Sequence, residues 1–372
     1  MVLNVDALLA VGGAALLAVW LGTFEHASVT QCAAHTRGAD AAVVLIGDPQ
    51  MEGLARVERE GWYGWFNNVL NDHMLRVALR SVLRSARPAL VVALGDLFHS
   101  QWLGDASFQH IYDRYVDVVA RTVARHAPPA ALLVNMSGNH DLGYGADLRA
   151  STLDRFVDHF GELNSAHELA DHLFVVVNAV ALDGCAAGLT DYDDAWAHVA
   201  DVEQRVADSP LPLVLLVHIP LFKPNGSCVG DSEALISWTA SNTGVYAQTV
   251  LSENTTELLL TRLRPVLVFS GHDHEGCVYR HAAHNVTEYT VRAAQGFLNT
   301  NLGVLAIRRR AAGFEYAFGD CAFWHTDSYV ALLVLVALWS AAVVSRAAMH
   351  FVFVVDDDRP AITTQKQNKK QR

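Results

Sequence analysis

Short apolar runs recur through the middle of the chain and alternate with segments whose apolar residues return every three or four positions. The runs are continuously apolar, which predicts strands covered on both faces, and the spacing between them predicts helices. This alternation predicts an α/β fold with helices outside a mixed sheet or a pair of sheets. The predicted strands are 41–46, 89–94, 131–136, 173–180, 213–217 and 266–269, followed by shorter ones at 286–291, 302–308 and 314–318; the predicted helices are 74–83, 112–124 and 151–160.

Two longer apolar stretches lie near the ends, at residues 7–21 and 329–344. A bilayer core is crossed by about 20 apolar residues in a helix. We therefore expect an N-terminal transmembrane anchor in 1–25 and a C-terminal transmembrane helix in 328–346, with one domain over 40–320. A cleaved signal peptide is the alternative for the first stretch, but Asp6 stands where positive charge is usual. A buried core helix is the alternative for the second.

The tail from 347 to 372 is polar and basic. Basic residues next to a span stay cytosolic, so we expect both termini in the cytosol and 40–320 in the lumen. Lys369 and Lys370 resemble a dilysine signal, which returns membrane proteins from the Golgi to the endoplasmic reticulum (ER); a frayed basic tail is the alternative. The expectation is an ER membrane protein that cycles with the Golgi.

In a lumenal domain, N-glycosylation acceptors can be modified and cysteines can form disulfides. Asn135 also fits the acceptor pattern but ends an apolar run, so we expect it to be buried. The cysteine count is five, so at least one thiol is left unpaired. Cys32 and Cys321 each lie just inside a predicted span and are able to meet, but the pairing stays open. The expected glycosylation sites are Asn225, Asn254 and Asn285.

Composition excludes two classes of protein. Hydrophobic residues make up 52% and charged residues 18%, the reverse of an intrinsically disordered chain. With 27 Lys and Arg against 39 Asp and Glu, the net charge is −12, which argues against nucleic-acid binding. An enzyme or binding domain with a large core remains.

Polar residues follow five predicted strands at their carboxyl ends. Ligands of open α/β sheets bind beyond this edge, so we expect these side chains to meet. A lone His is usually structural and a lone Gly-Asp is usually a turn, but their joint occurrence predicts a metal site that suits Mn, Fe or Zn. We expect the glycines before four of them to allow sharp turns. The residues are Asp48 and Gln50; Asp96; Asn139, His140 and Asp141; His218; and His272 and His274.

These motifs resemble the calcineurin-like metallophosphoesterases over roughly residues 42–310. The resemblance implies a β-sandwich flanked by helices, with two divalent ions at its edge, Mn in the first place and Fe or Zn as alternatives. His140 would be the general acid, with Asp141 orienting it. Gln50 stands where the family pattern has His, which puts the identity and affinity of the first metal in question. The implied ligands are Asp48, Asp96 and His274 for the first metal, and Asp96, Asn139, His218 and His272 for the second.

Residues 71–76 and 218–224 further resemble the Cdc1/Ted1 branch of that family. The branch implies a phosphodiesterase that removes an ethanolamine-phosphate side group from a mannose of glycosylphosphatidylinositol (GPI) anchors before ER exit. GPI-anchored proteins or the GPI glycolipid would be its substrates, and cargo-export receptors would be partners. One alternative is another lumenal metallophosphoesterase that acts on nucleotides or lipids. A second is a metal-binding cargo adaptor without turnover.

Two stretches beside the predicted ligands are candidate substrate contacts. Trp62, Tyr63 and Trp65 follow the first ligand loop; we expect them to pack in the core, and stacking on sugar is the alternative. The insert from 223 to 248 follows a ligand strand, where loops commonly shape a substrate pocket. A solvated surface loop is an equal alternative for it.

Overall fold

The computed structural model describes residues 32–208, 211–228, 235–238, 244–295 and 300–322, together with Gly13 and most of 331–345. The chain divides into a compact unit over 26–326 and a second unit of 1–25 and 327–372. In the second unit the described residues are helical. Among the residues that the structure describes, no helix combines the length and apolar character needed to cross a bilayer. The predicted spans lie wholly or partly outside the described residues, and the predicted retrieval signal, Lys369 and Lys370, lies entirely outside them.

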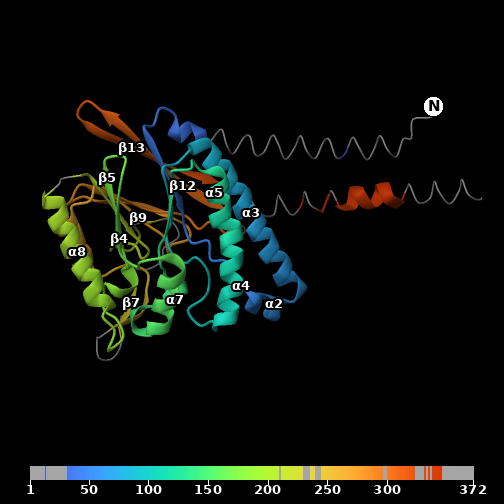
Figure 1. The fold of residues 1–372 in the computed structure, drawn as a ribbon, viewed down its shortest axis with the longest axis horizontal. Coiled ribbons are helices and arrows are strands. Elements are labelled where there is room, and N and C mark those ends of the chain that lie inside the picture. Colours follow the sequence, from blue (N-terminus) through green and yellow to red (C-terminus); the bar gives the residue numbers. More distant parts are fainter. Residues whose placement is uncertain are drawn as a thin grey trace, which may run out of the picture. The chain divides into compact units, whose positions relative to one another are not determined.

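Two sheets form the centre of the larger unit (Figure 1). Five strands make the first in the order β13 (Gly313–Ala322), β12 (Asn301–Arg310), β1 (Ala41–Ile46), β2 (Leu90–Ala93), β3 (Leu132–Asn135). Six make the second in the order β10 (Cys277–His281), β11 (Val286–Thr290), β9 (Leu267–Ser270), β6 (Leu213–Val217), β5 (His172–Val177), β4 (Ser165–Leu169). A separate pair joins β7 (Ile236–Trp238) and β8 (Val245–Gln248).

Alternate residues of the central strands enter two different apolar cores. Val43 and Leu45 of β1 pack with Phe174 and Phe269 of the other sheet. Val44 on the same strand belongs to the core beneath the helices. Both faces of the strand are therefore buried, which explains the continuously apolar runs and confirms the α/β fold predicted from them. The paired sheets agree with the sandwich that the family resemblance implies.

Helices cover the outer faces of the sandwich. The helix α3 packs on β1 and β12, and α8 packs on β5; Figure 1 shows α3, α4 and α5 together on one side of the domain and α8 on the other. The segment predicted as one helix over 112–124 continues through a π turn, η1. The helices are α2 (Leu54–Glu60), α3 (Trp62–Ala86), α4 (Asp105–Tyr115), η1 (Val116–Ala120), α5 (Arg121–His126), α6 (Asn139–Leu142), η2 (Gly145–Asp147), α7 (Ala150–Phe160), η3 (Ala179–Ala181), α8 (Asp191–Asp208) and α9 (Glu253–Leu263).

Two predictions from the pattern are wrong. The strand expected over 173–180 ends at Val177, because Asn178 precedes the 3₁₀ turn η3, in which the apolar residues Ala179–Ala181 are buried. The aromatic residues expected in the core are exposed: Trp62 by 79%, Tyr63 by 54% and Trp65 by 59%. The helix that carries all three, α3, extends its first turns beyond the core and buries apolar side chains only from Leu70 onward.

The cysteines form two disulfides. Cys32 bonds Cys321 across a sequence separation of 289, and Cys228 bonds Cys277. Cys185 is buried with a free thiol, in agreement with the odd count. The expected acceptors Asn225, Asn254 and Asn285 are all exposed. Asn135 is only half buried, and its side-chain oxygen accepts a hydrogen bond from the Tyr115 hydroxyl at 2.6 Å.

Candidate active site

The predicted ligands come together at the carboxyl edge of the sandwich. Because β1, β2 and β3 run parallel, as do β5, β6 and β9, their following loops meet on one side. Asp48, Gln50, Asp96 and His272 all have positive φ angles, between 30° and 69°. Non-glycine residues in this region carry backbone strain, which concentrates at functional sites where the surrounding structure holds it in place.

The glycines beside the ligands serve mainly to make room. A Cβ on Gly138 would collide with the Asp96 carboxylate, and one on Gly271 would collide with the carboxylate of Asp48. Among the four glycines that precede predicted ligands, only Gly95 has a positive φ, of 97°. The expectation of a sharp turn therefore holds at Gly95, and close approach of the carboxylates explains Gly138 and Gly271.

Asp96, His218 and His272 form the centre of the site. Each offers a ligand atom within 4.8 Å of the other two, and no metal is part of the structure. Nε2 of His218 lies 3.3 Å from Oδ1 of Asp96. It also lies 3.1 Å from the side-chain oxygen of Asn139. Asp96 and His218 are fully buried, so their charges are shielded from water and a cation between them would be held strongly.

The remaining ring nitrogens are tied to backbone oxygens. Nδ1 of His218 donates to the Leu94 carbonyl at 2.8 Å, and Nε2 of His272 donates to the Gln248 carbonyl at 2.9 Å. Because a carbonyl only accepts, the other nitrogen of each neutral ring carries a free lone pair, and that of His218, Nε2, faces Asp96. This is the arrangement that orients imidazole ligands around metals. Burial lowers the pKa of His218, but the Asp96 carboxylate outweighs it and raises that pKa to about 10. A divalent cation bound at Asp96 would replace the proton that His218 holds there. The set of one buried carboxylate and two imidazoles suits such a cation.

A second group lies around Asp48. Nε2 of His274 is 3.4 Å from Oδ2 of Asp48. The Asp48 carboxylate also accepts the backbone N–H of His272, at 2.9 and 3.1 Å to its two oxygens. The hydrogen bond that His274 donates to the Asp48 carboxylate raises the pKa of His274. Asp48 is buried and His274 is about one-third exposed, so this group opens toward solvent while the Asp96 group is closed.

Gln50 joins Asp96 to Gln295 through its amide. Its nitrogen donates to Oδ2 of Asp96 at 3.0 Å. Its oxygen accepts from the side chain of Gln295 at 2.7 Å, a buried partner that the sequence analysis missed. In this arrangement a hydrogen-bond donor of Gln50 faces Asp96, and the oxygen expected to bind metal is occupied. Its role as a ligand stays a prediction.

Replacing Gln50 with histidine should strengthen metal binding. An imidazole nitrogen would face Asp96 and Asp48 in place of the amide donor, and we expect a gain of about tenfold in affinity. The measurement is metal per chain after dialysis against a series of chelator concentrations. Gln295→Met, which frees the Gln50 oxygen without adding a ligand, is the matched control and should change affinity less. Equal metal retention by wild type and Gln50→His would contradict the prediction.

His140 lies over the site with its side chain about 30% exposed. Its backbone N–H donates to Oδ1 of Asp96 at 2.7 Å, and its ring Nε2 is 4.0 Å from Oδ2 of the same carboxylate. Two further contacts orient the His140 ring. Its Nδ1 lies 3.3 Å from the Gln101 amide nitrogen, and its centroid lies 4.1 Å from that of the His99 ring. A partly exposed imidazole held over buried ligands is placed to give a proton to a leaving group.

Asp141 acts differently from what we expected. Its carboxylate accepts the backbone N–H groups of Leu97, Phe98 and Gly138, at 3.1, 3.2 and 2.9 Å. In the described residues its hydrogen bonds reach the backbone and not the His140 ring. Burial, with the Asp96 charge nearby, raises the pKa of Asp141 to about 8, while the three N–H groups favour its ionised form. Asp141 thus joins its own loop, which carries Asn139, to the loop after β2, which carries Asp96. It does so because its carboxylate accepts N–H groups from both loops.

A buried ion pair supports the loop after His218. Glu288 is fully buried and accepts the Leu221 N–H at 3.1 Å; Nζ of Lys223 lies 3.3 Å from the same oxygen. Lys223 also donates to Thr290 at 2.7 Å, and His281 lies 3.0 Å from Glu288. Lys223, expected at the start of a pocket-shaping or solvated loop, is therefore a buried anchor.

Replacing Glu288 with alanine should destabilise the fold by about 3–5 kcal/mol, because Lys223 would be left as an uncompensated buried charge. The double variant Lys223→Met/Glu288→Leu should regain most of that loss. Thermal unfolding of the full chain in detergent measures both. Burial raises the pKa of Glu288, but Lys223 and His281 outweigh it and lower the pKa below its ordinary range.

The lowered pKa gives the pair a pH dependence with a definite sign. Glu288 stabilises the fold at pH values above the unfolded-state pKa, about 4.3, and that stabilisation is lost as the pH falls through the lower folded-state pKa. The apolar double variant should therefore lose less stability than wild type on acidification. If wild type and the double variant lost the same amount of stability as the pH falls, this assignment would be contradicted.

The chain is similar to known proteins in sequence. The family model described as calcineurin-like phosphoesterase matches residues 41–276. Cell division control protein 1 of Saccharomyces cerevisiae is 27% identical over 339 residues, covering 83% of this chain and 66% of that protein. Protein TED1 of the same yeast is 25% identical, covering 81% and 83%. Metallophosphoesterase 1 of Ailuropoda melanoleuca is 26% identical, covering 73% and 71%. The chain thus spans just under two thirds of the first relative.

Proposed function

Since the chain belongs to the calcineurin-like phosphoesterase family, and within it to the Cdc1/Ted1 branch, we propose that it is a membrane-anchored, two-metal phosphodiesterase of the ER lumen. Its proposed reaction removes an ethanolamine-phosphate side group from a mannose of GPI anchors. The observation that carries the reaction class is the buried set of carboxylate and imidazole groups beneath His140. The substrate rests on the resemblance to the branch.

The chain's own residues have separate roles in such a reaction. When bound, two divalent ions supply Lewis-acid activation of the phosphoryl group and of the attacking water. His140 gives a proton to the departing sugar oxygen as the phosphorus–oxygen bond breaks, and the water oxygen takes its place on phosphorus. The proton that the water loses passes to solvent, from which His140 regains one. Asp141 and Gln101 hold the His140 loop and ring. The residues that would hold the ions are Asp48, Asp96 and His274, with Gln50 beside them, and Asp96, Asn139, His218 and His272.

The disulfides support the lumenal placement. Two pairs, Cys32–Cys321 and Cys228–Cys277, close within the catalytic unit. Such bonds persist in oxidising compartments and are rare in the cytosol. We therefore propose that 40–320 is lumenal, that 1–25 and 328–346 anchor it, that the tail 347–372 is cytosolic, and that Lys369 and Lys370 return the protein from the Golgi.

Substrate preference tests this proposal. The full chain is purified in detergent, its Mn, Fe and Zn contents are measured, and release of ethanolamine-phosphate from a GPI-anchored protein is compared with hydrolysis of a nucleotide diester by the same preparation. We expect two ions per chain and preferential release from the GPI glycan. Two ions with nucleotide hydrolysis alone would move the substrate to another class of lumenal phosphoesterase. Full metal without any turnover would favour an adaptor.

A further inference from the structure

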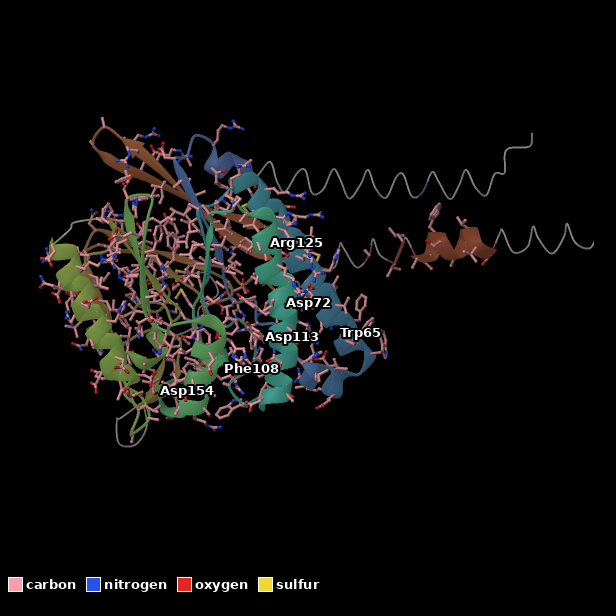
Figure 2. All side chains as sticks on the ribbon, viewed as in Figure 1. Trp65, Asp72, Phe108, Asp113, Arg125 and Asp154 are labelled. Atoms are coloured by element: carbon pink, nitrogen blue, oxygen red, sulfur yellow. A yellow bond between two sulfur atoms is a disulfide. The ribbon has the colours of Figure 1, made fainter. Side chains whose placement is uncertain are left out.

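The first turns of α3 and the start of α2 expose an unusual group of apolar side chains. Trp62, Trp65 and Val69 recur at helical spacing on one face of α3, and Leu54 and Tyr63 extend the group. Each is at least 46% exposed, and Trp62 reaches 79%. Figure 2 shows Trp65 projecting from α3 at the outside of the domain. We call these five residues the aromatic corner.

We propose that the aromatic corner docks on the interfacial region of a lipid bilayer. Trp and Tyr pair an apolar ring with a polar N–H or O–H group, and they are enriched where hydrocarbon meets lipid headgroups. Soluble proteins rarely expose contiguous apolar groups of this kind without a partner. The basic side chains next to the corner pair with carboxylates: Arg56 contacts Glu52 at 3.2 Å and Glu60 at 3.1 Å, and Arg59 contacts Glu52 at 3.2 Å. A neutral apolar face suits a bilayer surface without a demand for anionic lipid.

The ends of the catalytic unit bring a bilayer within reach. Cys321 lies opposite Leu302 on β12, and the next β12 residue, Gly303, lies opposite Leu45 near the carboxyl end of β1. The Cys32–Cys321 disulfide therefore places both chain exits at the edge that carries Asp48. Only residues 25–31 separate Phe24 from Cys32, and seven residues reach at most about 25 Å. The proposed anchors would thus hold the catalytic edge close to the membrane.

The aromatic corner also borders the catalytic residues. Leu54 and His99 line a common cavity of about 330 Å³, together with Arg56 and Arg59 of α2. The His99 ring in turn contacts His140. With the corner seated in the interface, the mouth of this cavity would lie at the level of lipid headgroups. A phosphate ester carried on a lipid-linked glycan would then reach His140 without leaving the membrane surface. This last step rests on the proposed substrate, whereas the docking rests only on the proposed membrane anchors and the exposed side chains.

The direct test places a fluorophore at the aromatic corner of the full chain in lipid nanodiscs. Trp65→Cys carries the label, and Leu132→Cys, exposed at the amino-terminal end of β3, is the matched control. We expect the Trp65 site to be quenched by nitroxide-bearing lipid and protected from aqueous iodide, with the reverse at the Leu132 site. Quenching by iodide at both sites would overturn the proposal. Protection from both quenchers at the Trp65 site would mean that protein, not lipid, covers the corner, and would also overturn it.

Kinetics separate this inference from the proposed function. Trp62→Ser/Trp65→Ser should raise KM for a lipid-linked substrate in vesicles about tenfold. The reason is that the double variant loses its interfacial contact and binds the vesicle surface about tenfold more weakly. Hydrolysis of a small soluble phosphodiester should not change, which shows that the variant is folded. An unchanged KM in vesicles would overturn the kinetic part. If wild type releases nothing from the GPI glycan but the quenching result holds, the docking stands and the substrate is wrong.

Discussion

Asp96→Asn should lower phosphodiesterase turnover at least about a thousandfold, because activation of phosphate by bound metal is worth several kcal/mol and each 1.4 kcal/mol is a factor of ten. Asp96 contacts both proposed ligand groups: Oδ1 faces His218, and Oδ2 accepts from Gln50. The neutral amide has the same shape but removes the charge that would hold the cations. We therefore expect metal content to fall together with turnover.

The measurements are metal per chain and turnover of a soluble phosphodiester, both on the full chain in detergent. Asp113→Asn, an identical change at an exposed position on α4, is the control and should retain both. Full metal content with normal turnover in Asp96→Asn would exclude Asp96 as the shared ligand. A drop in turnover with unchanged metal would assign Asp96 to another role, such as holding His140 through its backbone N–H.

His140→Ala should lower turnover by about 10²–10⁴ for substrates with a poor leaving group. The loss should shrink strongly when the leaving group is p-nitrophenolate, because that anion departs without a proton. The ring stands over Asp96 and contacts Gln101 and His99, which are not proposed ligands, so its removal leaves the buried ligands in place. We expect metal content to stay at the wild-type level.

Two substrates that differ only in leaving group measure this prediction. His110→Ala, an exposed histidine on α4, is the matched control. An equal loss on both substrates would show that His140 positions the phosphate or a ligand and does not supply a proton. A loss of metal in His140→Ala would place it in the coordination machinery instead.

The sequence was sufficient for the fully apolar strands and for the residues that follow them, but not for β4, β7, β8 and β10, which were not predicted. The runs at 41–46 and 213–217 coincide with β1 and β6, because both faces of these strands are buried and every position is apolar. The order of Asp, Asn and His residues after such strands was sufficient to place them at one edge, because parallel strands end together.

The hydrogen-bond partners of those residues could not be predicted from the sequence pattern. Gln295 reaches Gln50 across 245 positions, and Glu288 reaches Leu221 across 67. No periodicity links such positions, because the contacts arise from strand register and loop path. Asp141 was misassigned for the same reason: its neighbours are backbone N–H groups, which leave no trace in residue identity. The exposure of Trp62 depends on where α3 leaves the core, and helical spacing does not predict that point.

The Cys32–Cys321 bond gives the catalytic unit the topology of a closed covalent ring. A protease that cuts one exposed loop between these cysteines would open the ring without releasing a fragment. The nicked protein would migrate as one species on a gel without reductant and as two pieces with it. All five ligand-bearing strand ends lie inside the ring, so a single cut would leave them joined to one another through covalent bonds.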